Sequence, residues 1–300
     1  MKTGIFKIIY KTLLFMLPVP VAFELLFHTG FYPIITDSTP FDLKVITLQK
    51  HPVKSIKLMA IGSSITLYEL NSAILEQNLH VPYYNFASWS LVMADSRVLL
   101  NCFVKDYHPG YVVICSSIGD FSSAPNNTYS NYTSTNSWIR HHLPEYFYLK
   151  DYHSLHQIIR RKYNTYPVDF DNYGGATIKI PKGAQHKADI AVNFPNQYTP
   201  GEYQQLDSLS AMLKNKNIKL IFIQAPLRAS YANKVLSQEI ITAHFNHCRS
   251  IVESHNGIYL NYHNTRIFSD SLFEDQNHLT PAGSVVLTHE IVADLKKIIK

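Results

Sequence analysis

The sequence predicts an α/β fold of three layers, in which helices cover both faces of a mostly parallel sheet. Two observations lead to this expectation. Short apolar runs typical of strands alternate along the chain with segments of helical periodicity. In addition, residues 111–115 and 218–223 are almost unbroken apolar runs, as expected for parallel strands that are buried on both faces.

The strands are expected where apolar runs are bounded by turn residues. They cover residues 56–61, 80–86, 111–115, 218–223 and 257–260. The helices are expected where apolar residues recur at spacings of three and four. The first runs from the turn after the first strand to about residue 78, and the others cover residues 95–104, 201–215, 234–254 and 281–299. Thr280 can cap the last helix and Pro281 can open it.

The chain is expected to consist of an N-terminal segment (1–30), a linker (31–55) and one α/β domain (56–300). About eighty residues, 121–200, interrupt the domain and are too many for a loop of a compact fold. This insertion contains nine tyrosines. Aromatic faces can stack on sugar rings, and the alternative is that these side chains pack a small core within the insertion.

Residues 1–30 have a composition of their own. Three early lysines precede an apolar stretch of about 20 residues, which is long enough to span a bilayer. The lysines predict an N-terminus on the inside and a domain on the extracytoplasmic side, either periplasmic or at the cell surface. Because no small-residue cleavage site follows, an uncleaved signal anchor is favoured over a cleaved signal peptide. Glu24 and two prolines interrupt the stretch, so a buried N-terminal helix is the third reading.

The composition argues against several classes of function. The net charge of +5, from 27 basic and 22 acidic residues, is small and scattered, so no nucleic-acid partner is expected. The sequence has no zinc-type spacing of Cys and His, no P-loop and no Gly-x-Gly-x-x-Gly, so neither a metal nor a cofactor is expected. Cys102, Cys115 and Cys248 cannot all pair with one another, and buried free thiols are expected.

The turn Gly62-Ser63-Ser64 follows the first expected strand directly. Open α/β sheets bind ligands at the carboxyl ends of their strands, and unpaired N–H groups at a helix N-terminus can hold a negative oxygen. Helix capping by a serine explains such a turn equally well. The turn therefore becomes a candidate site only in combination with a second motif.

That second motif lies near the C-terminus, where Asp275 precedes His278 by three residues. In a turn, this spacing brings the carboxylate to the imidazole, where it fixes the tautomer and stabilises the cation that forms when His278 accepts a proton from a serine. The chain has 15 histidines, most of which are expected to be structural. The spacing from Asp275 and the position just before the last helix distinguish His278 from the others.

An early serine followed by a late Asp-x-x-His resembles the SGNH/GDSL esterase superfamily. The resemblance implies a flavodoxin-like α/β/α fold with Ser64 as nucleophile, His278 as base and Asp275 as its partner, while Ser63 is the weaker candidate for the nucleophile. The Gly-Asp-Ser of the family reads Gly62-Ser63-Ser64 here. Together with the N-terminal segment, this departure resembles a divergent, membrane-anchored branch that modifies envelope polymers, including D-alanyl-transfer proteins of teichoic acid.

The oxyanion-binding motifs of the family are matched less well. Residues 85–90 lie where its second motif is expected, and the glycine of that motif falls near Ser88 or Ser90. The third motif should read Gly-x-Asn-Asp, whereas this chain has Gly119 followed by Asp120 and lacks the asparagine. The resemblance implies Ser88, Ser90 and Gly119 as oxyanion residues. Loss of one oxyanion donor typically costs about 2.7–4 kcal/mol.

These observations favour a serine-dependent ester hydrolase, an esterase or deacylase that acts on acylated cell-envelope glycans. An acyltransferase with the same residues is one alternative, because only the acceptor of the acyl group differs. A non-catalytic module that binds a polymer or a partner enzyme is another, and the missing Asn and Asp favour it. The other expected partner is the membrane, through the N-terminal segment.

Overall fold

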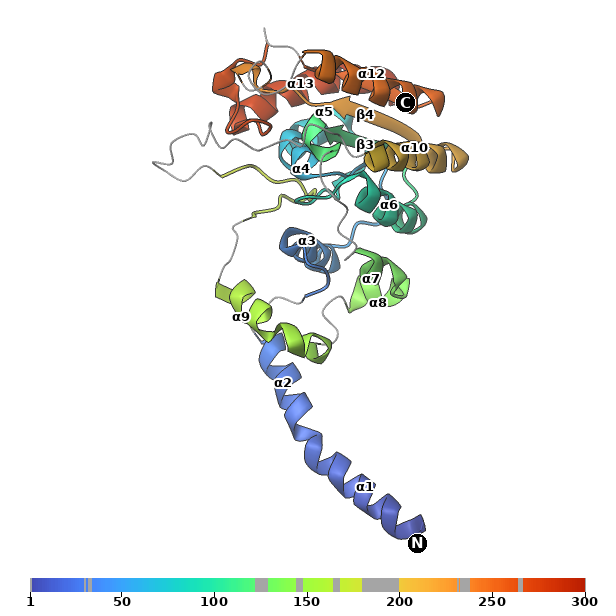
Figure 1. Cartoon of the computed structure of the whole chain (residues 1–300), viewed down its shortest axis with the longest axis vertical. Coiled ribbons are helices and arrows are strands. Elements are labelled where there is room, and N and C mark those ends of the chain that lie inside the picture. Colours follow the sequence, from blue (N-terminus) through green and yellow to red (C-terminus); the bar gives the residue numbers. More distant parts are fainter. Residues whose placement is uncertain are drawn as a thin grey trace. The chain divides into compact units, whose positions relative to one another are not determined.

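The computed structural model describes most of the chain (Figure 1). The described residues are 2–29, 31, 34–121, 129–143, 148–163, 168–179, 200–230, 232, 238–263 and 267–299. They divide into two compact units. One unit comprises Val53–Thr133 and Val168–Lys300, and the other comprises Met1–Pro52 and Ser134–Pro167.

The first unit contains a parallel sheet of five strands. These are β1 (Leu58–Ala60), β2 (Tyr83–Asn85), β3 (Tyr111–Ser116), β4 (Lys219–Gln224) and β5 (Ile258–Asn261). Their order across the sheet is β2-β1-β3-β4-β5, and every neighbouring pair is parallel. The chain order reverses beside β1, so the carboxyl ends of β1 and β3 form the switch point where such sheets bind ligands. The predicted three-layer α/β fold with a parallel sheet is confirmed.

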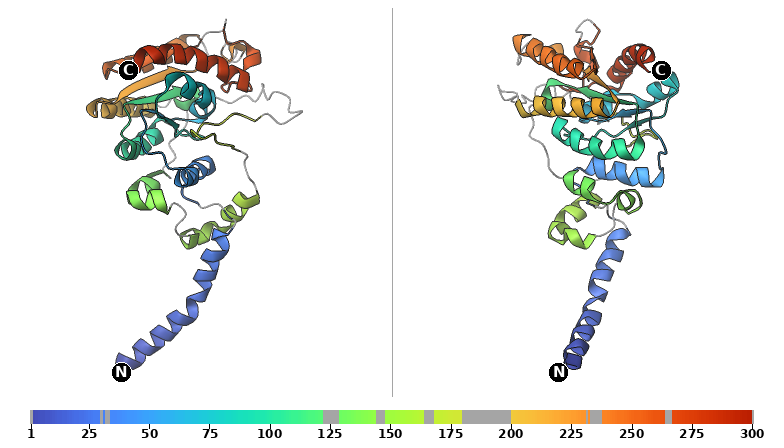
Figure 2. Two further views of the ribbon diagram at one scale, coloured as in Figure 1. Left: turned by 180° about the vertical axis from the view of Figure 1, so that it is seen from behind. Right: turned by 90° about the vertical axis from the view of Figure 1, so that its right-hand side faces the viewer.

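Helices cover both faces of this sheet (Figure 2). On one face α13 packs against α4 and α5, and on the other α10 packs against α6 and α12. Their bounds are α4 (Ser64–Glu69), α5 (Ser72–Leu79), α6 (Met93–Tyr107), α10 (Pro200–Asn215), α12 (Gln238–Ser254) and α13 (Pro281–Ile298). The core between the sheet and α13 is continuous and includes Leu58, Ala60, Leu287 and Ile291. Cys102, Cys115 and Cys248 are buried and are not joined in disulfide bonds, as predicted.

One predicted helix is in fact two. The chain leaves helical geometry at Leu70, and Asn71 begins α5 by accepting a hydrogen bond from the Ile74 N–H at 3.2 Å. Asn is among the preferred N-cap residues because its side chain satisfies an orphan backbone donor. As a result α4 is only six residues long. Residues 233–237, at the start of the helix expected over 234–254, lie outside the described part.

The second unit is helical. Its elements are α1 (Lys2–Met16), α2 (Pro18–His28), α3 (Thr39–Lys50), α8 (Ser137–His142), the 3₁₀ segment η2 (Tyr148–Ser154) and α9 (Leu155–Tyr163). Phe27, Tyr148 and Ile158 form the centre of its core. The carboxylate of Glu24 accepts hydrogen bonds from the N–H groups of Tyr148 and Leu149, at 3.0 and 2.5 Å. This contact gives Glu24 a structural role at the end of an apolar helix.

Residues 31–55, predicted as a linker, contain a helix. Helix α3 occupies residues 39–50 and buries Phe41 and Val45. It begins with Pro40 in its first turn, and the carboxylate of Asp42 accepts hydrogen bonds from the N–H and hydroxyl of Thr36 at 2.8 and 2.7 Å. Proline fits the first helical turn, which lacks intrahelical acceptors for its N–H groups. Pro40, one of the prolines that were interpreted as linker residues, therefore lies at the start of a helix.

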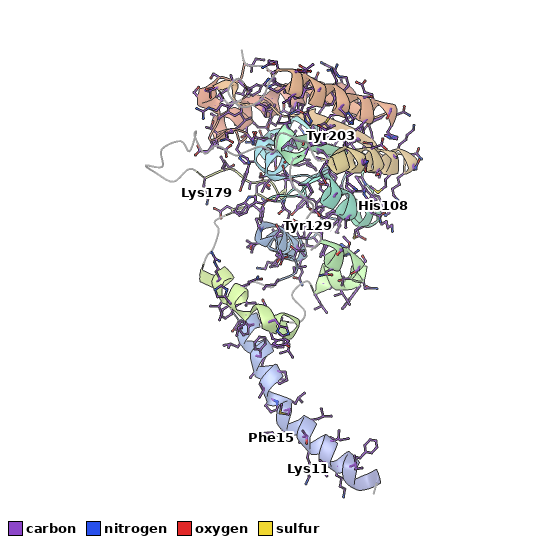
Figure 3. The ribbon with its side chains drawn as sticks, in the orientation of Figure 1. Lys11, Phe15, His108, Tyr129, Lys179 and Tyr203 are labelled. Atoms are coloured by element: carbon purple, nitrogen blue, oxygen red, sulfur yellow. The ribbon has the colours of Figure 1, made fainter. Side chains whose placement is uncertain are left out.

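Gly4–His28 is the only helical stretch in the described residues that is long and apolar enough to cross a membrane. It has 25 residues, and the apolar window of 18 residues within it is not buried in the structure, whereas Phe27 near its C-terminal end is buried. Lys11 and Phe15 both project from α1 in Figure 3. A signal sequence meets the same criterion of length and composition.

The predicted insertion is described in part, since residues 122–128, 144–147, 164–167 and 180–199 lie outside the described residues. Three of its tyrosines, Tyr129, Tyr132 and Tyr148, are buried. Tyr148 packs against Phe27 and Tyr132 against Phe103, so these two side chains contribute to cores shared with residues outside the insertion. Within the first unit, the segment 168–179 folds back on itself through a bridge between Phe170 and Ala176.

Candidate active site

The turn between β1 and α4 presents Ser64 at the carboxyl edge of the sheet. Gly62 has a φ of +147°, a conformation that L-residues rarely adopt. A Cβ atom on Gly62 would lie 2.3 Å from the Thr66 hydroxyl, which itself donates to the Cys115 carbonyl at 2.6 Å and accepts from the Cys115 N–H at 3.1 Å. Thr66 thus ties α4 to β3, and the glycine leaves room for that contact. Ser64 follows as the first residue of α4.

The loop before α13 holds His278 in a defined orientation. One carboxylate oxygen of Asp275 accepts hydrogen bonds from the N–H groups of Asn277 and His278, each at 2.8 Å. The other lies 2.8 Å from Nδ1 of His278. The Glu274 N–H donates to the His278 carbonyl at 2.8 Å, and Thr280 caps α13 through the Gly283 N–H. The predicted turn geometry is therefore present.

Ser64 and His278 are neighbours in space although 214 positions separate them. The hydroxyl oxygen of Ser64 lies 2.8 Å from Nε2 of His278. With Nδ1 carrying the proton that Asp275 accepts, Nε2 is free to accept the proton of Ser64; this tautomer follows from the hydrogen-bond network. The three residues predicted from the two motifs thus form one connected chain of contacts.

The electrostatics of these residues suit proton transfer. Burial alone lowers the pKa of His278, but the hydrogen bond and charge of Asp275 outweigh it and raise that pKa above its ordinary value of 6.5. For Asp275, burial acts to raise the pKa, and the hydrogen bonds from His278 and Asn277 lower it below its usual range. The carboxylate therefore stays ionised near neutral pH, and His278 readily accepts a proton.

Ser63, the weaker candidate for the nucleophile, makes other contacts. Its side chain is only 3% exposed. Its hydroxyl accepts the Ile65 N–H at 3.2 Å and is hydrogen-bonded to the carboxylate of Asp120. Asp120 also accepts from the Ser116 hydroxyl at 2.8 Å. Ser63 is thus engaged as the N-cap of α4, whereas Ser64 is partly exposed and contacts the imidazole.

The predicted oxyanion residues are in different situations. The N–H of Ser88 donates to the Gly62 carbonyl at 3.0 Å, so it is already used within the fold. Ser90 is exposed and has a φ of +55°. Gly119 lies in the 3₁₀ turn η1 (Ile118–Phe121) that follows β3. The N–H of Ser64, as the first of its helix, has no intrahelical acceptor.

Sequence reasoning did not single out Glu69, the last residue of α4. Glu69 is 0% exposed, and its carboxylate accepts a hydrogen bond from the Leu279 N–H at 2.8 Å. Burial raises the pKa of Glu69 to about 8. The signal that could have identified Glu69 in the sequence is an acidic residue placed between Leu67 and Leu70, two apolar residues that are buried.

Aromatic side chains line one side of the candidate site. The ring centroids of Tyr68 and His278 lie 6.1 Å apart, in an edge-on arrangement. The Trp89 indole N–H donates to the Tyr68 hydroxyl at 2.6 Å. Val168 and Phe170, from the insertion, pack against the same apolar cluster as Tyr68 and Trp89. Part of the insertion therefore borders the site.

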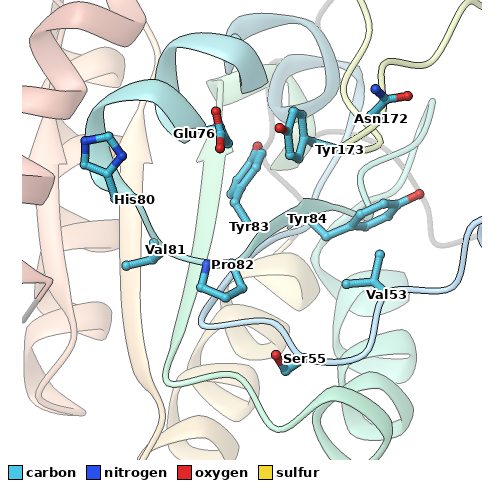
Figure 4. A pocket seen from close by; sticks show the side chains of 10 residues that line it. All are labelled: Val53, Ser55, Glu76, His80, Val81, Pro82, Tyr83, Tyr84, Asn172 and Tyr173. Carbon is cyan, nitrogen blue, oxygen red and sulfur yellow. The ribbon is translucent and has the colours of Figure 1, made fainter.

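A separate cavity of about 490 Å³ lies beside the edge strand β2 (Figure 4). Tyr83, Tyr84 and Tyr173 line it together with Glu76 and His80, whereas none of the triad residues does. The described residues contain no group of three His, Cys, Asp or Glu side chains arranged to hold a metal ion.

No protein-family model matches the chain, and no curated protein matches it either. Among solved structures, a lipase/acylhydrolase from Enterococcus faecalis is 14% identical with a TM-score of 0.47, and the match covers 82% of this chain and 98% of that one. A GDSL-like lipase from Bacteroides thetaiotaomicron is 12% identical with a TM-score of 0.44, covering 86% and 98%. An acetylxylan esterase from Geobacillus stearothermophilus is 12% identical with a TM-score of 0.42, covering 81% and 95%. At this level of similarity, no residue role, substrate or family membership carries over to this chain.

Proposed function

We propose that this protein is a serine-dependent ester hydrolase of the SGNH type, with Ser64, His278 and Asp275 as its catalytic triad. One observation supports this above all: the Ser64 hydroxyl lies 2.8 Å from Nε2 of His278, whose Nδ1 lies 2.8 Å from Asp275. A nucleophile within hydrogen-bond reach of a base, itself oriented by a third group, is the arrangement that activates a serine.

In the proposed reaction, the Ser64 oxygen attacks the carbonyl carbon of an ester while Nε2 of His278 takes the hydroxyl proton. The imidazolium is stabilised by the Asp275 carboxylate and returns the proton to the leaving alcohol, so an acyl group remains on Ser64. Water then attacks the acyl group while His278 takes its proton, and His278 returns that proton to the Ser64 oxygen as the free acid leaves. Each half-reaction breaks one C–O bond and forms another.

The negative oxygen of each tetrahedral intermediate needs hydrogen-bond donors. We propose that the Ser64 N–H is one donor and that Ser90 or Gly119 supplies a second. The Ser88 N–H is a poor candidate, because it already donates to the Gly62 carbonyl.

For the substrate we propose acyl esters on cell-envelope glycans. The N-terminal stretch Gly4–His28 supports a location at a membrane, with the α/β unit on the extracytoplasmic side as an uncleaved signal anchor would place it. Tyr68 beside His278, together with Trp89 hydrogen-bonded to Tyr68, gives the site an aromatic wall of the kind that can pack against a sugar ring or an acyl chain. Transfer of the acyl group to a second sugar, as in teichoic acid modification, requires only that a sugar hydroxyl replace water.

Fluorophosphonate labelling of the full-length protein in detergent tests the nucleophile. We expect the wild type and Ser63→Ala to be labelled and Ser64→Ala to remain unlabelled. Equal labelling of all three would contradict the assignment of Ser64, and no labelling of any would favour a non-catalytic binding module. If labelling occurs, product analysis with and without an acceptor glycan separates hydrolysis from transfer.

A further inference from the structure

Glu69 connects two parts of the candidate site that are far apart in sequence. Its carboxylate accepts the Leu279 N–H at 2.8 Å, and Leu279 directly follows His278. The Glu69 carbonyl accepts the Thr288 hydroxyl at 3.1 Å, which joins the same residue to α13. Glu69 and Leu279 are 0% and 1% exposed. A buried N–H that loses its acceptor is strongly disfavoured, so this contact constrains the loop.

Helix α4 carries Ser64 at its first position and Glu69 at its last. The two residues are separated by about 7.5 Å along the axis, at about 1.5 Å per residue. One short, rigid element therefore holds the hydroxyl at one end and the backbone next to the imidazole at the other. The Ser64–His278 distance is set by this element as well as by the loop that contains Asp275.

We propose that Glu69 is a positioning residue, which fixes the backbone at Leu279 and thereby keeps the ring of His278 within reach of Ser64. This inference rests on the proposed function, since it assigns Glu69 a role in placing the triad. The Glu69 carboxylate binds the backbone N–H of Leu279, so it acts on the ring of His278 indirectly.

The charge of Glu69 gives the proposal a measurable signature. The titratable groups that face it are His278 and Asp275 from the loop and Cys115 from β3. Burial keeps the pKa of Cys115 well above its usual value, so the thiol stays neutral. Burial raises the pKa of Glu69 to about 8. Once ionised, the Glu69 carboxylate helps to raise the pKa of His278 through its charge.

The rate of fluorophosphonate labelling, measured against pH in the full-length protein, tests the proposal with Glu69→Gln, Glu69→Leu and Glu76→Gln. Glutamine keeps an acceptor for the Leu279 N–H but cannot ionise, whereas leucine has a similar volume and no acceptor. Glu76 lies on the neighbouring helix α5, away from the triad, and its variant serves as the matched control for loss of a carboxylate.

We expect Glu69→Leu to be labelled about 10²-fold more slowly, because a displacement of about 1 Å costs that much. Glu69→Gln should keep a rate within several-fold of the wild type, but the midpoint of its pH profile should be lower, because the charge of Glu69 no longer raises the pKa of His278. Glu76→Gln should match the wild type in both measurements.

Three results would overturn the inference: a wild-type rate for Glu69→Leu, an unchanged pH profile for Glu69→Gln, or the same shift in Glu76→Gln. Thermal melting of each variant shows whether it folds, and if Glu69→Leu does not, the profile of Glu69→Gln decides. Absence of labelling in the wild type would instead refute the proposed function.

Discussion

Replacement of Asp275 by asparagine examines the proposed triad at the carboxylate that orients His278. Asparagine retains an oxygen that can accept the N–H groups of Asn277 and His278, so the turn should persist. It removes the negative charge that stands 2.8 Å from Nδ1 of His278. The loss should therefore fall on the imidazolium that forms during attack rather than on the folding of the loop.

The size of the effect follows from the geometry. For charge centres about 4 Å apart, the attraction is about 1 kcal/mol in water and about 4 kcal/mol at the dielectric constant typical near a protein surface. The side chain of Asp275 is 38% exposed and that of His278 is 23% exposed, so solvent screening keeps the value below the upper figure. An intermediate value of about 2.7 kcal/mol corresponds to about a 10²-fold decrease in rate.

The assay is the second-order rate of fluorophosphonate labelling at neutral pH, with Asp207→Asn as a matched control. Asp207 also lies 2.8 Å from a histidine, His255, but that pair is remote from the two motifs. We expect a decrease in Asp275→Asn and none in Asp207→Asn. A rate for Asp275→Asn within twofold of the wild type would refute the role given to the carboxylate.

Three further predictions concern the base His278 and the turn between β1 and α4. The labelling rate should rise with pH, with a midpoint above 6.5, because only neutral His278 can take a proton and its pKa is raised; a midpoint below 6.5 in a rate–pH profile would contradict this. Ser63→Ala should lower the free energy of unfolding by about 1 kcal/mol through loss of the N-cap, as measured by urea denaturation, and a loss of labelling instead would reopen the choice between the serines. Gly62→Ala should destabilise the protein by about 1–3 kcal/mol because of its positive φ and the clash with Thr66. Gly110→Ala, whose Cβ would meet only the Lys57 side chain at 3.4 Å, is the control for Gly62→Ala, and equal stability of the two variants would count against the strain.

The sequence alone was sufficient for the strands and for the two motifs. Parallel strands buried on both faces require continuous apolar runs, and β3 and β4 were recognised for that reason. The Asp275–His278 turn and the capping by Thr280 depend on contacts within a few residues, so spacing was enough to predict them. The break in the helix at Leu70 and helix α3 were missed. They depend on the capping by Asn71 and on the burial of Phe41, and the composition of a short stretch reveals neither.

Contacts between distant segments were decided only by the tertiary structure. Sequence spacing carries no information on a separation of 214 positions; the placement of β1 beside β3 and the packing of α13 against α4 bring Ser64 to His278. The same packing engages Ser63 with Asp120 and buries Glu69 against Leu279. Identical residue types thus acquire different chemistry, because burial and long-range hydrogen bonds determine which hydroxyl stays accessible and which carboxyl loses its solvent.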